Sequence, residues 1–178
     1  MATDYYSWTV SVARDELPID SRDWVVYELP DAVSDAMGRD DAIRTSSGRD
    51  RLHFSLRALI QAFGATSLAF LDRGDPPKAD DKAGTVCEGF VVSALMPEDV
   101  SAALSAIDEI LHDADRLSRA TELGSLSDDD LAQWREKAYN GEFADDDDFV
   151  RFLVCLQWVL EDAQTRGDVV AHAHYVYY

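Results

Sequence analysis

The chain has 178 residues, 47% of them hydrophobic, which suits a single domain over residues 1–178 with a core of its own. Its 16 basic and 35 acidic residues give a net charge of −19, and this charge disfavours binding to nucleic acid or anionic lipid, because phosphate groups would be repelled. No apolar run is long enough to span a membrane, and no secretory signal opens the chain, so we expect a cytoplasmic protein.

The first quarter of the chain is predicted to hold two strands and a short helix. In residues 4–13, aromatic and aliphatic side chains alternate with mostly polar ones, which predicts a strand with one face buried. The run that starts at Trp24 is a short strand ended by Pro30, and residues 31–37 follow as a short helix. Residues 38–50 have many charges and no apolar period, so we expect no regular element there.

The middle of the chain is predicted to alternate helices with short strands. Residues 52–63 carry the apolar stripe of a helix that stops at Gly64, and residues 67–71 are a short apolar strand. Residues 72–89 contain two prolines, three glycines and eight charges, which indicates a mobile loop. Residues 90–95 form a strand of the buried type, and Pro97 then opens a helix.

The last third of the chain is predicted to end in a long helix and a strand. A capped helix is expected over residues 127–139. Residues 145–167 read as one helix with two apolar ridges, of which Val150, Val154 and Trp158 form the second. Two ridges predict a helix covered on both sides, between a sheet and a second layer. Residues 169–178 alternate as a final strand.

These elements predict an α+β fold. We expect a small antiparallel or mixed sheet that includes both terminal strands. Four or five helices pack against this sheet, with the C-terminal helix at the centre.

His172 and His174 are the most suggestive pair for chemistry. Residues two apart on a strand project to the same side, so both imidazoles can reach one metal ion. A zinc site needs a third ligand, and no spacing in the chain points to one. The alternative is that the two histidines simply alternate with alanine on the outer face of a terminal strand, and the pattern favours this alternative.

Aromatic side chains are the other candidate functional group. Tyr175, Tyr177 and Trp158 can form a binding surface, because aromatic residues are enriched at the centres of protein interfaces. Packing in the core is the competing role for each of them. The phosphate-binding, zinc-protease and nucleophile-elbow motifs are absent, so no cofactor is predicted.

Three stretches of the chain match a known pattern: LHFSL at 52–56, GFVVSALMPEDVSAALSAI at 89–107 and RGDVVAHA at 166–173. Through these stretches the chain resembles, from about residue 52 to residue 173, the YfbM-like family of bacterial domains of unknown function. It implies a small, soluble α+β domain without an established activity. The resemblance transfers no functional residues.

Binding rather than catalysis is the predicted role. We expect a soluble protein-binding module whose acidic surface meets a basic protein, as an immunity-type or regulatory partner would. Negative charge that serves solubility alone is the simpler explanation of the composition. A metal-dependent enzyme that uses His172 and His174 is the alternative function, and self-association through the aromatic terminal strands is also open.

Overall fold

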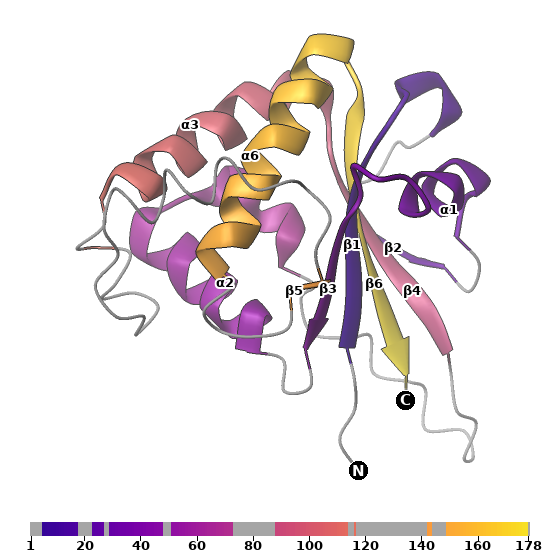
Figure 1. The fold of residues 1–178 in the computed structure, drawn as a ribbon, viewed down its shortest axis with the longest axis horizontal. Coiled ribbons are helices and arrows are strands. Elements are labelled where there is room, and N and C mark those ends of the chain that lie inside the picture. Colours follow the sequence, from indigo (N-terminus) through magenta and orange to yellow (C-terminus); the bar gives the residue numbers. More distant parts are fainter. Residues whose placement is uncertain are drawn as a thin grey trace.

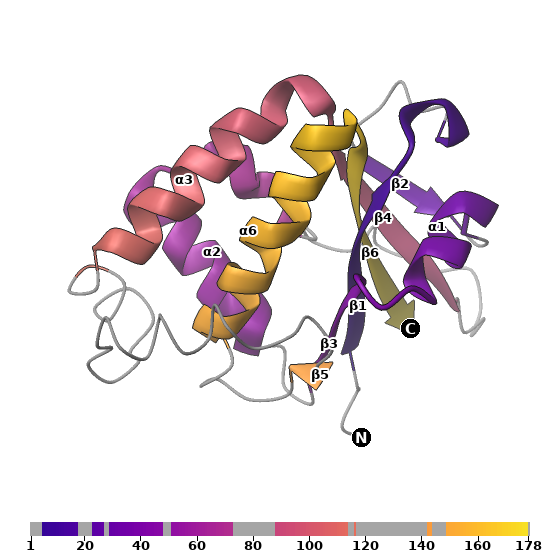
Figure 2. The same cartoon turned by 45° about the horizontal axis from the view of Figure 1, so that its top comes forward.

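The protein is described by a computed structural model at residues 5–17, 23–26, 29–47, 51–72, 88–113, 116, 142–143 and 149–177. These residues form a six-stranded sheet with helices on both faces (Figures 1 and 2). Strands from both ends of the chain belong to the sheet, and the predicted α+β fold is confirmed.

Antiparallel pairing dominates the sheet. Its strands are β1 (Tyr5–Val12), β2 (Asp23–Val26), β3 (Ile43–Ser47), β4 (Glu88–Leu95), β5 (Glu142–Phe143) and β6 (Val169–Tyr177). They lie in the order β2-β4-β6-β1-β3-β5, and only β3 and β5 pair in parallel. The two terminal strands, β1 and β6, are therefore central neighbours.

Helices cover the two faces unequally. The described α-helices are α1 (Asp31–Met37), α2 (Arg51–Phe63), α3 (Val100–His112) and α6 (Phe149–Arg166), and short 3₁₀ helices are η1 (Arg14–Glu16), η2 (Thr66–Leu71) and η3 (Pro97–Asp99). One face carries α1, and the opposite face carries α2, α3, α6 and η2 (Figure 2). Among these described helices, none is long and apolar enough to cross a membrane.

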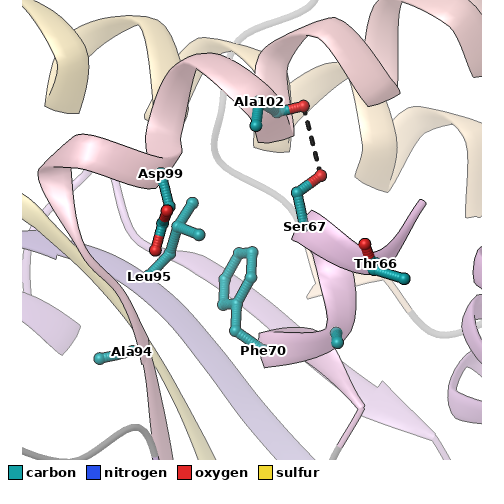
Figure 3. A pocket seen from close by; sticks show the side chains of 8 residues that line it. Thr66, Ser67, Phe70, Ala94, Leu95, Asp99 and Ala102 are labelled. Carbon is teal, nitrogen blue, oxygen red and sulfur yellow. Dashed lines mark hydrogen bonds between the residues drawn. The ribbon is translucent and has the colours of Figure 1, made fainter.

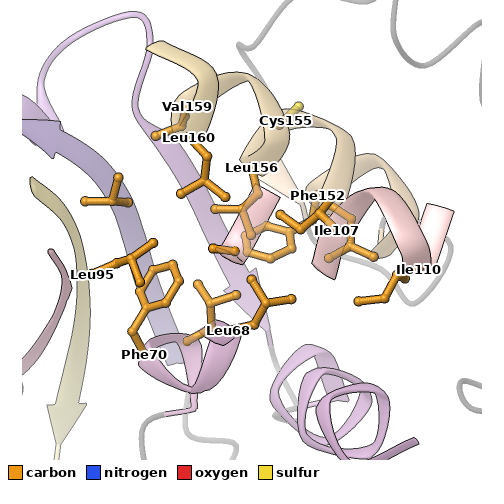
Figure 4. Packing of buried hydrophobic residues seen from close by; sticks show 14 of the residues in the cluster. Leu68, Phe70, Leu95, Ile107, Ile110, Phe152, Cys155, Leu156, Val159 and Leu160 are labelled. Carbon is orange, nitrogen blue, oxygen red and sulfur yellow. The ribbon is translucent and has the colours of Figure 1, made fainter. Parts of the chain in front are cut away.

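Helix α6 lies between the sheet and α3, as its two apolar ridges predict. Five consecutive side chains, from Phe152 to Leu156, are at most 1% exposed, so this stretch is covered on every side. Figure 4 shows Leu156 and Leu160 in the layer between α6 and the sheet, and Phe152 beside Ile107 of α3. On the second ridge, Val154 is buried and Trp158 packs against the core, while the Val150 side chain is outside the described part.

A smaller core fills the other side of the sheet. Val33 and Ala36 of α1 pack there in one cluster with Val10 and Val12 of β1 and with Ala171 of β6. The polar residues on the opposite face of β1 are buried as well, beneath the α6 layer. The prediction that only one face of this strand is buried is therefore wrong, because helices cover the sheet from both sides.

Two predicted segments fold differently. Ile43–Ser47 forms strand β3 where no element was expected, since backbone pairing with β1 holds a segment whose only apolar side chain is Ile43. Thr66–Leu71 is the 3₁₀ helix η2 rather than a strand. Its apolar side chains Leu68, Phe70 and Leu71 reach the main core from a helical turn, so burial alone did not require a strand.

The remaining boundaries follow the sequence pattern where the chain is described, except that β4 begins at Glu88, inside the loop predicted over residues 72–89, rather than at residue 90. Gly64 ends α2 with a φ of 63°, and Gly167 ends α6 with a φ of 73°. A positive φ is a conformation that favours glycine. Most of the loop predicted over residues 72–89 falls outside the described residues, as does the helix predicted over 127–139. So do residues 145–148, which were predicted to begin the long helix.

Candidate functional site

The two histidines of β6 lie on the buried face of the sheet, beneath α6. His172 is 5% exposed and His174 is 7% exposed, so the prediction of an outer, solvent-facing position is wrong. Their buried polar neighbours come from β1 and β4: Ser7, Thr9, Ser11 and Ser93. In the register of the sheet, Thr9 and Ser93 flank His172 on either side, and Ser7 is opposite His174.

Hydrogen bonds hold this buried polar row in place. Thr9 Oγ1 lies 2.9 Å from His172 Nδ1, and the Ser93 hydroxyl donates to the carbonyl of Phe70 in η2. At the end of the row, Ser11 Oγ donates to Asp168 Oδ2 over 2.8 Å. Buried polar groups are costly unless they are paired, so such bonds are what lets this row lie under a helix.

The residues around the histidines do not assemble a metal centre within the described part of the chain. There, no group of three or more His, Cys, Asp or Glu side chains is placed to hold a metal ion. Protein zinc sites use three or four such ligands. The two histidines thus lie on the same face of β6, as predicted, but their buried polar neighbours carry hydroxyl groups.

The opposite face of the sheet carries a continuous aromatic surface, which we define as Tyr6, Trp8, Phe90 and Tyr175. The ring centroids of Tyr6 and Trp8 are 6.3 Å apart, those of Trp8 and Phe90 are 5.9 Å apart, and those of Phe90 and Tyr175 are 5.1 Å apart. These separations fall in the range at which aromatic rings attract one another. All four side chains keep part of their surface exposed.

Strand register creates this surface. Tyr6 of β1 and Phe90 of β4 are both direct cross-strand neighbours of Tyr175 in β6. On the other side, Arg44 of β3 is paired with Trp8, and its guanidinium carbon lies 5.6 Å from the Tyr6 ring centroid and 5.8 Å from that of Trp8. The aromatic surface therefore already binds one cationic group through its rings.

The described residues of α1 and of the turn after it bring exposed carboxylates to this side of the sheet. Helix α1 and the turn after it present Asp31, Asp35 and Asp40 to solvent. Arg39 in the same turn pairs with groups of the protein itself: its Nε lies 3.3 Å from Asp41 Oδ1, and its Nη2 donates to the Ser11 carbonyl. Exposed carboxylates thus lie on the same side of the sheet as the aromatic rings.

The structure separates the three aromatic residues predicted to bind together. Tyr175 belongs to the aromatic surface, whereas Trp158 packs on α6 against the main core, on the other side of the sheet. The Tyr177 side chain lies outside the described part. Sequence reasoning did not group Tyr6, Trp8 and Phe90 with Tyr175, because alternation shows which residues of one strand share a face but not which strands are neighbours.

Comparisons with family models, with curated proteins and with solved structures find no match to this chain. The resemblance to YfbM-like domains stays a prediction.

Proposed function

We propose that this protein is a non-catalytic binding module that takes a basic partner protein onto the aromatic surface and the exposed acidic residues on the same side of the sheet. The observation that carries the proposal is the unbroken row of ring contacts from Tyr6 to Tyr175 on a face that the short helix α1 covers only in part. Tyrosine and tryptophan dominate the energetic centres of protein interfaces, so a row of this kind is a fitting contact for a protein partner.

The charge of the molecule determines the kind of partner. A net charge of −19 opposes association with a second copy or with any other acidic protein, and it accelerates encounter with a basic one. Arg44 supports the same choice, because it demonstrates within the chain that these rings stack with a guanidinium group. An immunity-type or regulatory role toward a basic protein is the function that combines both features.

Two aromatic substitutions provide a matched test. Wild type, Tyr175→Ala and Trp158→Ala are immobilised and used to capture proteins from lysate of the source cells, and the retained partner is then titrated by calorimetry. Both residues are partly buried aromatics, but they lie on opposite sides of the sheet. We expect wild type and Trp158→Ala to bind a partner with a basic isoelectric point and Tyr175→Ala to lose it, whereas Tyr175→Phe retains it.

Salt completes this test. Affinity is expected to fall steeply as ionic strength rises above about 0.15 M, since exposed charges are then screened within about 8 Å. A captured partner that is acidic, or whose affinity does not change with salt, contradicts the proposal. So does equal loss of binding by both alanine variants while circular dichroism shows them folded.

A further inference from the structure

We propose that a groove between η2 and α3 binds a linear polyamine. This groove lies in the helical layer, on the other side of the sheet from the aromatic surface, so the inference is independent of the proposed function. It consists of two adjoining cavities of about 450 Å³ and about 350 Å³ that share Thr66, Ser67 and Ala102 as lining residues. Each volume is in the range of small-molecule sites.

One side of α3 forms the floor of the groove. Ala102, Ser105 and Ala106 line its middle with small side chains, and the Ser67 hydroxyl of η2 crosses to α3 there by donating to the Ala102 carbonyl over 3.2 Å (Figure 3). Asp99, the last residue of η3 and the residue just before α3, lines one end, and Glu109 of α3 lines the other; Ala102, Ser105, Ala106 and Glu109 have the helical spacing of one side of α3. Ten residues at 1.5 Å each separate the two carboxylates by about 15 Å along the helix axis.

An aromatic ring accompanies each carboxylate. Asp99, Leu95 and Phe70 line one cavity, and in Figure 3 the Leu95 side chain lies between the Asp99 carboxylate and the Phe70 ring. At the far end, Phe63 and Glu109 line the second cavity together. Acid and aromatic ring together are the combination that recognises a cation. Among the described residues that line the two cavities there is no lysine, arginine or histidine.

A cation of the protein itself, Arg116, contacts two residues of the Glu109 end, although it is not one of the described lining residues. The Arg116 guanidinium carbon lies 4.3 Å from the Phe63 ring centroid, and Arg116 Nη1 lies 3.6 Å from Glu109 Oε1. Arg116 also donates to the carbonyl of Ala62. These contacts show that Phe63 and Glu109 together can bind a cationic group. They also make Arg116 a competitor of any ligand whose charge reaches that end.

The walls favour a polyamine over an extended peptide. Both walls are helical, so they offer no strand edge for a peptide backbone to pair with. A polyamine has no such backbone. Its aliphatic body can pack on Phe70 and Ala102, its inner ammonium groups can donate to the hydroxyls of Thr66 and Ser105, and its ends can reach the two acids.

Calorimetry with spermine at low salt tests the proposal. We expect one-to-one binding, weakened about fivefold by Asp99→Asn or Glu109→Gln, as for partly exposed ion pairs. Arg116→Ala should tighten binding, because it removes the competing cation. Glu161→Gln removes the same charge from an exposed position of α6 outside the groove and should leave the affinity unchanged within about twofold.

Ligand length and groove filling provide the remaining controls. Putrescine, too short to reach both acids, should bind much more weakly than spermine. Ala102→Phe fills the groove from an exposed helix position, so it should abolish spermine binding without unfolding the protein. It should leave binding to the basic partner intact, just as Tyr175→Ala should leave spermine binding intact, so that failure of either proposal is seen separately.

Several outcomes would each overturn the groove proposal. The first is equal weakening by Glu161→Gln and Asp99→Asn, which would mean that spermine responds to net charge alone. The second is equal affinity for putrescine and spermine, or no gain with Arg116→Ala. The third is a short peptide with lysines at both ends that binds more tightly than spermine, which would reassign the groove to a polypeptide.

Discussion

Thr9 Oγ1 and His172 Nδ1 are 2.9 Å apart beneath α6, and they join residues 163 positions apart in the sequence. Thr9 is 1% exposed and His172 is 5% exposed, so water has little access to this hydrogen bond. The bond joins the first strand to the last at the centre of the sheet. This hydrogen bond therefore links the two central strands and at the same time pairs two polar groups that are buried beneath the helical layer.

Removing the hydroxyl should test that link. We expect Thr9→Val to lower the free energy of unfolding by about 1–3 kcal/mol, because it removes a buried partner of the histidine without changing the shape of the side chain. Urea denaturation of Thr9→Val, His172→Leu and the double variant measures the coupling. The double variant should lose less than the sum of the single losses. Additive losses would mean that the two groups do not stabilise each other.

Metal binding by His172 and His174 is tested separately. The part of the chain that the structure describes brings no third ligand to this pair, so we expect Zn²⁺ to leave the melting temperature unchanged. Thermal unfolding with and without Zn²⁺, together with elemental analysis of the purified protein, checks this expectation. Stoichiometric zinc that His174→Ala removes would instead support the metal-dependent alternative.

The ion pair between Arg57 and Asp72 should contribute measurably to stability. Arg57 donates through Nε and Nη2 to both carboxylate oxygens of Asp72, at 3.0 and 2.9 Å, and so ties α2 to the residue that follows η2. Lysine cannot reproduce this two-pronged geometry. We expect Arg57→Lys to lower the free energy of unfolding by about 0.5–1 kcal/mol in urea denaturation, a modest effect because both side chains are partly exposed.

Arg14 provides the control for this substitution. Arg14 Nη1 lies 3.5 Å from Glu98 Oε2, and both side chains are more than half exposed. Arg14→Lys should therefore leave stability unchanged within error. A loss equal to that of Arg57→Lys would show that the paired geometry contributes nothing.

Glycine is required at two helix ends by backbone conformation alone. A Cβ added at Gly64 or Gly167 would meet no atom within 4 Å, yet both residues have positive φ. Alanine at either position should cost about 1 kcal/mol of unfolding free energy. Gly38→Ala is the matched control, since Gly38 ends α1 with a φ of −83° and should tolerate alanine without loss. Thermal unfolding of the three variants would separate conformation from packing.

The helices were largely predictable from the sequence because each has a local signal. The apolar stripes and the flanking Gly64 and Pro97 indicate α2 and α3, and the predicted helix over residues 31–37 coincides with α1. Segments without a local signal were predicted wrongly. Strand β3 exists because β1 lies beside it, and η2 is helical although a short apolar run is compatible with either form.

The candidate surfaces required spatial information of another kind. Alternation in β6 correctly separates Tyr175 from the histidines, but it does not reveal that α6 covers the histidine face. Trp158 and Tyr175 looked equivalent in the sequence and lie on opposite sides of the sheet. The groove between η2 and α3 combines residues that no motif connects.

The sequence by itself determined the α+β class, most of the described helix boundaries, the burial of α6 and the negative charge, because periodicity, helix-end residues and composition are local or additive properties. Only the tertiary structure decided which strands are neighbours and which face each helix covers. Strand order and helix packing depend on contacts between distant residues, such as Thr9 with His172, and these contacts have no local signature.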